Sequence, residues 1–202
     1  MRILLFSDIH SDLRTLERLA ATPADLYVCA GDLVSWARGL DACADVLRPL
    51  GSSLHVLPGN HESAGQIEAF CDRYGFTPFH ERTKQVGRYT VAGLGYSSPT
   101  PFNTPGEYTE EQLEDKLAAF HGLNPLVLVC HAPPFGTSLD RIEEGLHAGS
   151  RSVRAFVEAA QPEYFFCGHI HESEGVTETI GRTVAVNLGK RGYLLDLEDE
   201  AV

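Results

Sequence analysis

The chain has 202 residues, a hydrophobic content of 43%, a charged content of 22% and a formal net charge of −12. These proportions are typical of a globular protein long enough to bury a core, and they exclude an intrinsically disordered chain. A protein that grips duplex nucleic acid needs lysine and arginine on the phosphates, so the acidic balance argues against that class. Bound divalent cations would nevertheless reverse the sign of the charge locally.

Targeting signals and disulfides are not expected. The apolar run Met1–Phe6 is too short for a secretory signal, and no stretch approaches the roughly 18 apolar residues that a membrane helix needs. The five cysteines lie apart without CxxC spacing, and Cys29, Cys130 and Cys167 stand inside apolar runs, where cysteine behaves as a small buried hydrophobe. We expect free thiols, a reducing cytoplasmic location and no contact with a membrane.

Strands and helices alternate in the first third of the chain. Apolar runs predict strands over Arg2–Ser7, Leu26–Ala30 and Leu54–Leu57. Leu13, Leu16 and Leu19 lie on one helical face after the first strand, and helical stretches follow the second and third strands. The expected helices cover Leu13–Leu19, Leu40–Leu47 and Ala64–Arg73. This alternation predicts a parallel sheet built from βαβ units.

The middle of the chain changes character. Gln85–Gly95 reads as a strand or hairpin with glycines at its bends, and Tyr96–Tyr108, rich in Pro, Ser, Thr and Gly, reads as a long loop. Thr109, with Gln112 three residues on, is a capping box for a helix that reaches about Phe120.

The last third ends in several short strands. A strand at Leu126–Cys130 precedes a Pro-rich loop, and Ser150 is the expected N-cap of a helix that ends near Gln161. Short connections between the closing strands favour antiparallel or mixed pairing; the strands are Tyr164–Cys167, Val176–Ile180, Thr183–Asn187 and Tyr193–Leu197. No repeat or linker divides the chain. We therefore expect a single domain over residues 1–202, an α/β fold in which two mixed β-sheets pack face to face with helices outside, an αββα sandwich.

Five polar clusters share one position, because each follows an apolar strand directly. They are Ser7-Asp8-Ile9-His10, Gly31-Asp32, Gly59-Asn60-His61-Glu62, Cys130-His131 and Gly168-His169-Ile170-His171. Ligands of α/β sheets bind at the carboxyl ends of strands, so the five clusters can converge. In extended backbone, residues two apart point the same way, so Asp8 with His10, and His169 with His171, could each supply two ligands.

The residue types in these clusters indicate a transition-metal site. Carboxylate oxygen, amide oxygen and imidazole nitrogen suit manganese, the metal we expect, or iron, zinc, cobalt or nickel. Taken singly, Asp32 would be read as a helix cap, Asn60 as a turn residue, and His131 and His169 as core histidines. Five such clusters in one chain make the joint metal site the better interpretation.

The order DxH, GD, GNHE, a strand-ending His and GHxH resembles the calcineurin-like metallophosphoesterase superfamily, from Asp8 to His171. The resemblance implies a binuclear metal centre. One ion would be held by Asp8, His10, Asp32 and His171, and the other by Asp32, Asn60, His131 and His169. Asp32 would then bridge the pair, and His61 would contact the phosphate and protonate the leaving group.

The stretches Pro101–Glu107 and Cys167–Glu172 resemble short, single-domain members of the superfamily, some of whose relatives act on phosphodiesters that include cyclic nucleotides. Two positions depart from the family pattern: Ser35 stands where a further acidic residue is common, and Asn187-Leu188-Gly189 replaces Asn-Pro-Gly. Neither is a ligand position, so the departures bear on substrate details.

Several residues near the motifs have open roles. We expect Trp36 to fill the core rather than line the site, and His55, His80, His121 and His147 to be surface or packing residues, with His147 as the first exception to consider. Loop residues that could shape a substrate pocket are Tyr96, Phe102, Asn103 and Phe135. Arg151 and Arg154 are placed to meet phosphate, but a solvated helix face explains them equally well.

The sequence thus predicts a metal-dependent phosphoester hydrolase in which a metal-bridging hydroxide attacks phosphorus. The substrate is expected to be a small phosphodiester, for which a cyclic nucleotide is one candidate, with a phosphomonoester as the alternative. A non-catalytic scaffold for protein partners is a second hypothesis, although scaffold members tend to lose ligands and none is missing here. A nuclease is disfavoured by the acidic charge and the lack of a basic stripe. The oligomeric state stays open.

Overall fold

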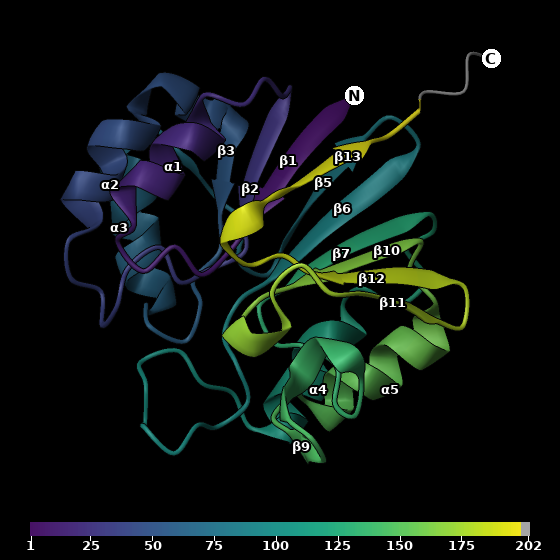
Figure 1. Ribbon diagram of the computed structural model, residues 1–202. Helices are drawn as coiled ribbons and strands as arrows, with labels where there is room; N and C mark the ends of the chain where they lie inside the picture. Colours follow the sequence, from purple (N-terminus) through teal and green to yellow (C-terminus); the bar gives the residue numbers. More distant parts are fainter. Residues whose placement is uncertain (199–202) are drawn as a thin grey trace.

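Two large β-sheets pack face to face, and helices cover their outer faces (Figure 1). The structure is a computed structural model that describes residues 1–198. This is the four-layer αββα arrangement that the sequence predicts. Within residues 1–198, no helix combines the length and the apolar character needed to cross a membrane.

The first sheet has the strand order β13-β1-β2-β3-β4. Four of its strands are parallel, as the βαβ pattern predicts, and β13 runs antiparallel to β1. The strands are β1 (Arg2–Phe6), β2 (Leu26–Cys29), β3 (Leu54–Val56), β4 (Thr77–Pro78) and β13 (Tyr193–Asp196). The helices on this side are α1 (Leu13–Ala20), α2 (Leu40–Leu47), the 3-10 helix η1 (Arg48–Ser53) and α3 (Ala64–Tyr74).

The second sheet has the order β11-β12-β10-β7-β6-β5, in which the four inner strands are parallel and both edge strands antiparallel. Its strands are β5 (Arg82–Val86), β6 (Tyr89–Leu94), β7 (Leu126–Cys130), β10 (Tyr164–Cys167), β11 (Thr177–Ile180) and β12 (Thr183–Asn187). Two helices cover it, α4 (Glu110–Ala118) and α5 (Arg151–Ala160). Shorter elements are η2 (Ser138–Asp140), β8 (Arg141–Glu143), β9 (Leu146–His147), η3 (His171–Ser173) and η4 (Gly189–Arg191).

The alternation of side chains along β1 explains why this strand is apolar on both faces. Ile3 and Leu5 point into the layer between the two sheets, where they join Phe166 of the second sheet. Leu4 and Phe6 point the other way, into the layer between the first sheet and its helices. A strand buried on both faces reads as a continuous hydrophobic run, which is the pattern of a parallel sheet.

The predicted signals at helix ends are confirmed, and the closing strands have the expected mixed pairing but belong to two sheets. Thr109 and Gln112 form both hydrogen bonds of a capping box, and Ser150 accepts from the backbone N–H of Val153. Of the closing strands, β10, β11 and β12 stay in the second sheet, but β13 crosses to the first sheet and covers the free edge of β1. All five cysteines are buried free thiols.

Candidate metal centre

The residues expected to hold the first metal lie together, although they come from both sheets. His10 Nε2 lies 3.0 Å from His171 Nε2 and 3.7 Å from Asp32 Oδ2. Asp8 Oδ1 lies 3.5 Å from His171 Nε2. Asp8, His10 and His171 each have one ligand atom that lies within 4.8 Å of the other two.

The residues expected to hold the second metal lie beside the first group. Asn60 Oδ1 lies 3.2 Å from His131 Nε2 and 2.9 Å from His169 Nδ1. Asp32 Oδ2, the atom close to His10, is also 3.5 Å from His131 Nε2. The Asp32 carboxylate therefore lies between the two groups, which is the position of the bridging ligand that the family resemblance implies.

Left-handed turns, rather than extended backbone, bring the ligands together. Asp8, His10, Asp32 and His169 have φ values of 55°, 48°, 54° and 71°. The expectation that Asp8 with His10, and His169 with its neighbour two residues on, project by strand alternation is therefore wrong. The chain turns sharply as it leaves each strand, and non-glycine residues are held in this costly region mainly at functional sites.

Two glycines of the motifs are required by close approach. A Cβ on Gly59 would overlap with the Asp32 carboxylate, and one on Gly168 would overlap with the side chains of Ser7 and Asp8. Each glycine lies directly before a proposed ligand and against a ligand from another loop. Glycine is therefore required before Asn60 and before His169, because the ligand loops pack too closely there for a Cβ.

A side chain and a carbonyl behind the ligands orient two of them. His131 Nδ1 donates to the carbonyl of Ala30 at 2.8 Å, which leaves Nε2 free to ligate. Asn60 Nδ2 donates to Thr104 Oγ1 at 3.2 Å, so Asn60 Oδ1 faces the histidines. Thr104, buried in the long middle loop, carries no sequence signal of this role.

Ser35 supports His10 in the same way. Its Oγ lies 3.0 Å from His10 Nδ1, and a hydrogen on Nδ1 leaves Nε2 as the ligand atom. The sequence marks Ser35 only as a departure from the family pattern, where an acidic residue is common. A neutral hydroxyl here orients the imidazole without adding another negative charge.

Glu62 joins two of the ligand loops. Its buried carboxylate accepts backbone hydrogen bonds from Asp32 at 3.1 Å, Val34 at 3.0 Å and Gly59 at 3.0 Å. Burial, with the nearby Asp32 charge, raises the pKa of Glu62 to about 8, against the effect of these N–H donors. The last letter of the GNHE cluster is therefore structural, because it positions the loops that carry Asp32 and Asn60.

The electrostatics of the cluster favour cations. Burial alone would raise the pKa of the Asp8 and Asp32 carboxyls, but neighbouring histidines outweigh it, and the pKa of both lies below its usual value. Burial also disfavours charge on His131, yet Asp32 outweighs it and raises the pKa of His131 to about 9. Burial lowers the pKa of His169 to about 4. The Asp8 and Asp32 carboxylates thus stay ionised, and the imidazoles lie around them.

This donor set fits two divalent metal ions. The ligand nitrogens and oxygens, all of which carry lone pairs, lie 2.9–3.7 Å from one another. Cations shared between these atoms stabilise the arrangement, whereas hydrogen bonds can pair only some of the lone pairs. The ligand nitrogens of His10 and His131 are turned inward by the hydrogen bonds on their other nitrogens. The nitrogen and oxygen donors, without a thiolate, match the transition metals expected from the sequence.

His61 lies at the rim of the cluster. Its backbone N–H donates to Asp32 Oδ1 at 2.9 Å, and its ring makes a T-shaped contact with the His10 ring at 5.2 Å between centroids. His61 Nδ1 accepts the backbone N–H of Trp36 at 3.3 Å. The ring hydrogen of neutral His61 is therefore on Nε2, which makes Nε2 a hydrogen-bond donor.

The expectation that Trp36 fills the core is wrong. Trp36 is 48% exposed, and its ring contacts the ring of His61 at 5.6 Å between centroids. The reason is local: Trp36 and Ala37 both have positive φ in a tight turn closed by the bridge between Ser35 and Arg38. This turn presents the indole at the surface instead of directing it inward.

The residues of the long middle loop differ in exposure. Phe102 is 72% exposed, and Asn103 is exposed with a φ of 51°. Tyr96 is half-buried instead, because its hydroxyl accepts the backbone N–H of Ala64 and its ring packs on His80. Tyr96 thus helps to fix the base of the loop.

The basic residues considered for phosphate binding have partners of their own. The Arg151 guanidinium lies over the Phe135 ring at 4.0 Å, and Arg154 pairs with Glu158 at 2.6 Å. The imidazole of His147 bonds to buried Asp140 at 2.7 Å. For Arg154, the solvated helix face explains the contacts that the structure has.

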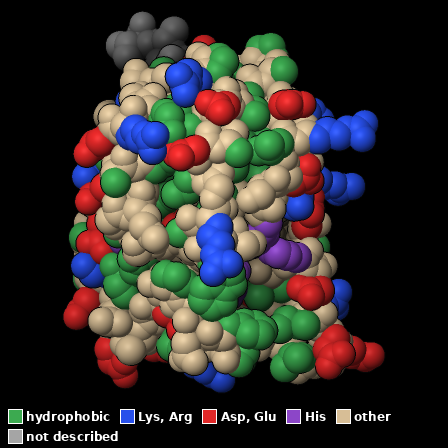
Figure 2. Space-filling model, turned by 90° about the vertical axis from the view of Figure 1, so that its left-hand side faces the viewer, with side chains coloured by type: hydrophobic (Ala, Val, Ile, Leu, Met, Phe, Trp, Pro, Cys, Tyr) green, Lys and Arg blue, Asp and Glu red, His purple; other side chains and the backbone are tan. Residues whose placement is uncertain are grey.

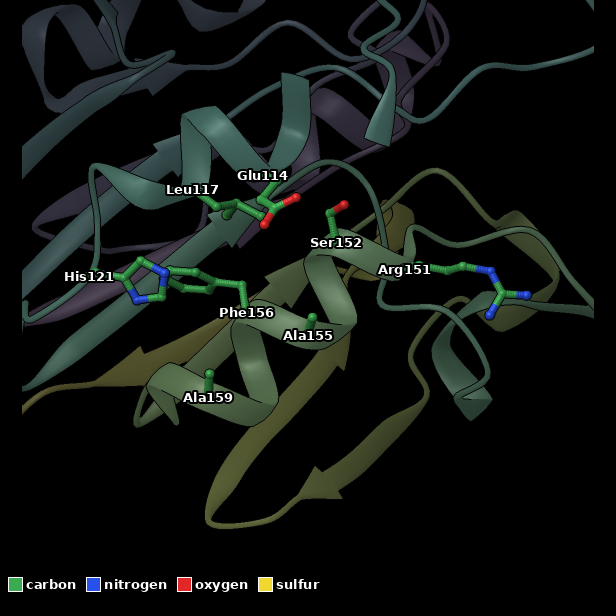
Figure 3. A pocket seen from close by; sticks show the side chains of 8 residues that line it. All are labelled: Glu114, Leu117, His121, Arg151, Ser152, Ala155, Phe156 and Ala159. Atoms are coloured by element: carbon green, nitrogen blue, oxygen red, sulfur yellow. The ribbon is translucent and has the colours of Figure 1, made fainter. Parts of the chain in front are cut away.

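A cavity of about 370 Å³ lies apart from the ligand cluster, between α4 and α5. Leu117, Phe156 and Ala159 form part of its wall, while Arg151 extends away from the other lining side chains (Figure 3). None of the seven expected ligands lines it. The reactive side chains are gathered at the strand ends instead. Figure 2 shows the side of the molecule on which histidine side chains reach the surface beside hydrophobic ones.

Comparisons with known proteins agree with this geometry. The profile of the calcineurin-like phosphoesterase family matches residues 1–173. The Methanocaldococcus jannaschii protein MJ1162 is 33% identical, and the match covers 96% of this chain and 91% of MJ1162. The probable cyclic nucleotide phosphodiesterase RPA0124 of Rhodopseudomonas palustris is 26% identical, over 77% of this chain and 63% of that protein. The crystal structure of TT1561 of Thermus thermophilus is similar in fold, with a TM-score of 0.69 and 20% identity over 93% of this chain and 88% of that one.

The chain belongs to the calcineurin-like phosphoesterase family, which confirms the resemblance carried by the sequence motifs. Members of this family depend on two divalent metal ions, and candidate ligand groups for them are present here. The protein is a metal-dependent phosphoester hydrolase.

Proposed function

We propose that the protein is a phosphodiesterase acting on a small substrate, with its centre built from the seven expected ligands. The observation that carries the proposal is the convergence of two nitrogen and oxygen ligand groups on one carboxylate oxygen, Asp32 Oδ2. One ion would be held by Asp8, His10, Asp32 and His171, and the other by Asp32, Asn60, His131 and His169. Manganese is the metal we propose.

Two bound divalent ions would supply hydroxide near neutral pH and positive charge for the phosphoryl oxygens. The chain itself holds the ligands at fixed positions. Glu62, Ser35 and Thr104 each hold a ligand side chain or its loop in place, as the hydrogen bonds to Asp32, His10 and Asn60 indicate. Such preorganisation lowers the reorganisation needed during in-line attack on phosphorus.

His61 is the proposed proton donor. Because Nδ1 accepts from Trp36, neutral His61 can donate a hydrogen bond from Nε2 to a phosphoryl oxygen; uptake of a proton on Nδ1, which breaks the Trp36 contact, gives the imidazolium that can pass the Nε2 proton to the leaving oxygen. General acid catalysis of this kind contributes roughly 10²–10⁴ in rate. Asp32 also acts on the chemistry indirectly, because its Oδ1 accepts the His61 backbone N–H and so holds the donor beside the ligands.

Two observations favour a small diester over other phosphoesters. The relative RPA0124 carries the name probable cyclic nucleotide phosphodiesterase. A diester bears a single negative charge, so it is repelled less than a monoester dianion by a chain with a net charge of −12. The same charge disfavours nucleic acid as the substrate.

The test is a metal-dependent activity screen. Protein stripped with chelator and refilled with Mn²⁺ is assayed on bis-aryl phosphate, cyclic nucleotides and aryl phosphate monoester. We expect diester turnover that disappears on stripping and returns with Mn²⁺. Turnover of the monoester alone would replace the diester assignment, and no turnover of any ester with any metal would overturn the proposal.

A His61→Ala variant tests the proton-donor role separately. We expect it to keep both metal ions and to lose at least about 100-fold in turnover. Replacing the leaving group by one of low pKa, which needs no proton, should restore much of the rate. An equal loss of metal content would assign His61 a structural role instead.

A further inference from the structure

Trp36 is held at the surface by an unusual turn. The two central residues of the turn, Trp36 and Ala37, have φ values of 54° and 52°, and the backbone N–H of Arg38 donates to the Ser35 carbonyl at 3.1 Å. Turns with two positive φ values are normally built from asparagine and glycine. A tryptophan and an alanine in this conformation are strained, and such strain concentrates at functional sites.

The turn lies next to the catalytic machinery. Ser35 contacts His10, and the Trp36 backbone N–H donates to His61. The rings of His10, His61 and Trp36 make successive T-shaped contacts, at 5.2 Å and 5.6 Å between centroids, that lead outward from the candidate metal centre. The indole is thus the first aromatic surface beyond the proposed proton donor.

Much of the Trp36 indole faces solvent. Trp36 is 48% exposed, while the Val34 and Leu33 side chains just before it are fully buried. The T-shaped contact with His61 uses part of the ring and leaves the rest to solvent. A flat, electron-rich surface beside a phosphoester site is suited to stacking on a planar ring, and base–aromatic stacking is favourable for every nucleobase.

We propose that Trp36 is a specificity-determining residue that stacks on the nucleobase of a nucleoside phosphoester bound at the metal centre. This rests on the proposed function and narrows its substrate class from small phosphodiesters to those that carry a base. The Trp36 backbone N–H fixes the His61 ring while the Trp36 side chain holds the base. One turn therefore couples substrate recognition to the orientation of the proton donor.

The chain offers a direct readout, because Trp36 is its only tryptophan. Zinc-loaded protein is used, because Zn²⁺ is not paramagnetic and does not quench fluorescence in that way. The fluorescence is excited at the red edge of tryptophan absorption. Adenosine 5′-monophosphate and ribose 5-phosphate are titrated in turn, and calorimetry measures the binding of each. We expect adenosine 5′-monophosphate to change the emission saturably, and ribose 5-phosphate to bind with little change. Adenosine 5′-monophosphate that binds without changing the emission overturns the proposal.

Variants separate stacking from general damage. In Trp36→Ala, the preference for adenosine 5′-monophosphate over ribose 5-phosphate, taken as the ratio of dissociation constants, should fall about ten-fold. Trp36→Phe keeps a flat ring and should retain most of the preference, and Leu194→Ala, which truncates an exposed apolar side chain on β13, should leave it unchanged. An unchanged preference in Trp36→Ala overturns the stacking role.

The same experiment distinguishes the two proposals. If neither phosphate compound binds and no phosphoester is turned over, the proposed function fails and the stacking role fails with it. If phosphoesters are turned over but ribose 5-phosphate binds as tightly as adenosine 5′-monophosphate, only the stacking role fails. In the active enzyme, Trp36→Ala should raise KM for a nucleoside diester more than it lowers kcat.

Discussion

Replacing Glu62 by glutamine should damage both the stability and the centre of the protein. Glu62 Oε2 accepts the backbone N–H of Asp32 and of Gly59, and Oε1 accepts that of Val34. A glutamine has a single acceptor oxygen, so it keeps at most two of these three bonds and turns its NH₂ toward a backbone donor. The Glu62 side chain is fully buried, so water does not replace the lost acceptor.

The magnitude follows from the lost bond. An unmatched buried N–H costs about 1–3 kcal/mol, and we expect Glu62→Gln to lose an amount of unfolding free energy in that range. Because two of the bonds hold the backbones of Asp32 and Gly59, turnover should also fall by about 10-fold or more, as for other groups that orient metal ligands.

The assay is urea unfolding of the metal-loaded protein at about pH 9, above the Glu62 pKa of about 8, so that the Glu62 carboxylate is ionised, together with diester turnover. Glu110→Gln is a matched control, since Glu110 accepts hydrogen bonds from Ser150 Oγ and from the backbone N–H groups of Arg151 and Ser152 but is partly exposed. The control should cost less than about 1 kcal/mol. Equal, small effects of both substitutions would refute the reasoning that Glu62 holds the two loops.

Three further substitutions have defined outcomes. Ser35→Ala removes the contact to His10 Nδ1 and should weaken the first metal site about 10-fold in a chelator competition, whereas unchanged affinity would deny Ser35 an orienting role. Gly168→Ala would press a Cβ on the Asp8 carboxylate, so metal content measured by emission spectroscopy should drop; full occupancy would show that the loops can separate. Burial lowers the pKa of His80 from 6.5 to about 4 in the folded protein, so the unfolded chain binds more protons between these pH values. The unfolding free energy should therefore fall by up to about 3 kcal/mol as the pH drops from 6.5 to 4. His80→Gln should flatten that fall in urea titrations, and an unaltered pH profile would contradict it.

Much of the fold could be predicted because its signals are local. The apolar runs at Leu26 and Leu126 and the capping box at Thr109 are each specified by a few neighbouring residues, and the structure has the expected strands and helix there. The crossing of β13 to the edge of β1 is different, because it depends on which edge is free once the sheets have formed. No short-range pattern near Tyr193 encodes that choice.

The candidate site divides in the same way. The ligand residues are visible in the sequence because each follows a strand, but their left-handed backbone is not, and alternation gave the wrong geometry for Asp8 and His10. Thr104 is separated from Asn60 by 44 residues, so its contact exists only after folding. Trp36 is exposed by the turn between Ser35 and Arg38, in which two non-glycine residues have positive φ, and no sequence pattern predicts that conformation.

The central claim is that one cluster of seven side chains binds two metal ions and uses them to hydrolyse a phosphoester. The most direct measurement determines bound metal per chain and diester turnover for the wild type and Asp32→Ala. Asp45→Ala, which removes an exposed carboxylate paired with Arg48, is the control. The account predicts two ions per chain and chelator-sensitive turnover in the wild type and the control, and loss of both ions and of turnover in Asp32→Ala. A wild-type chain that turns over the diester undiminished after its metal has been removed would contradict it.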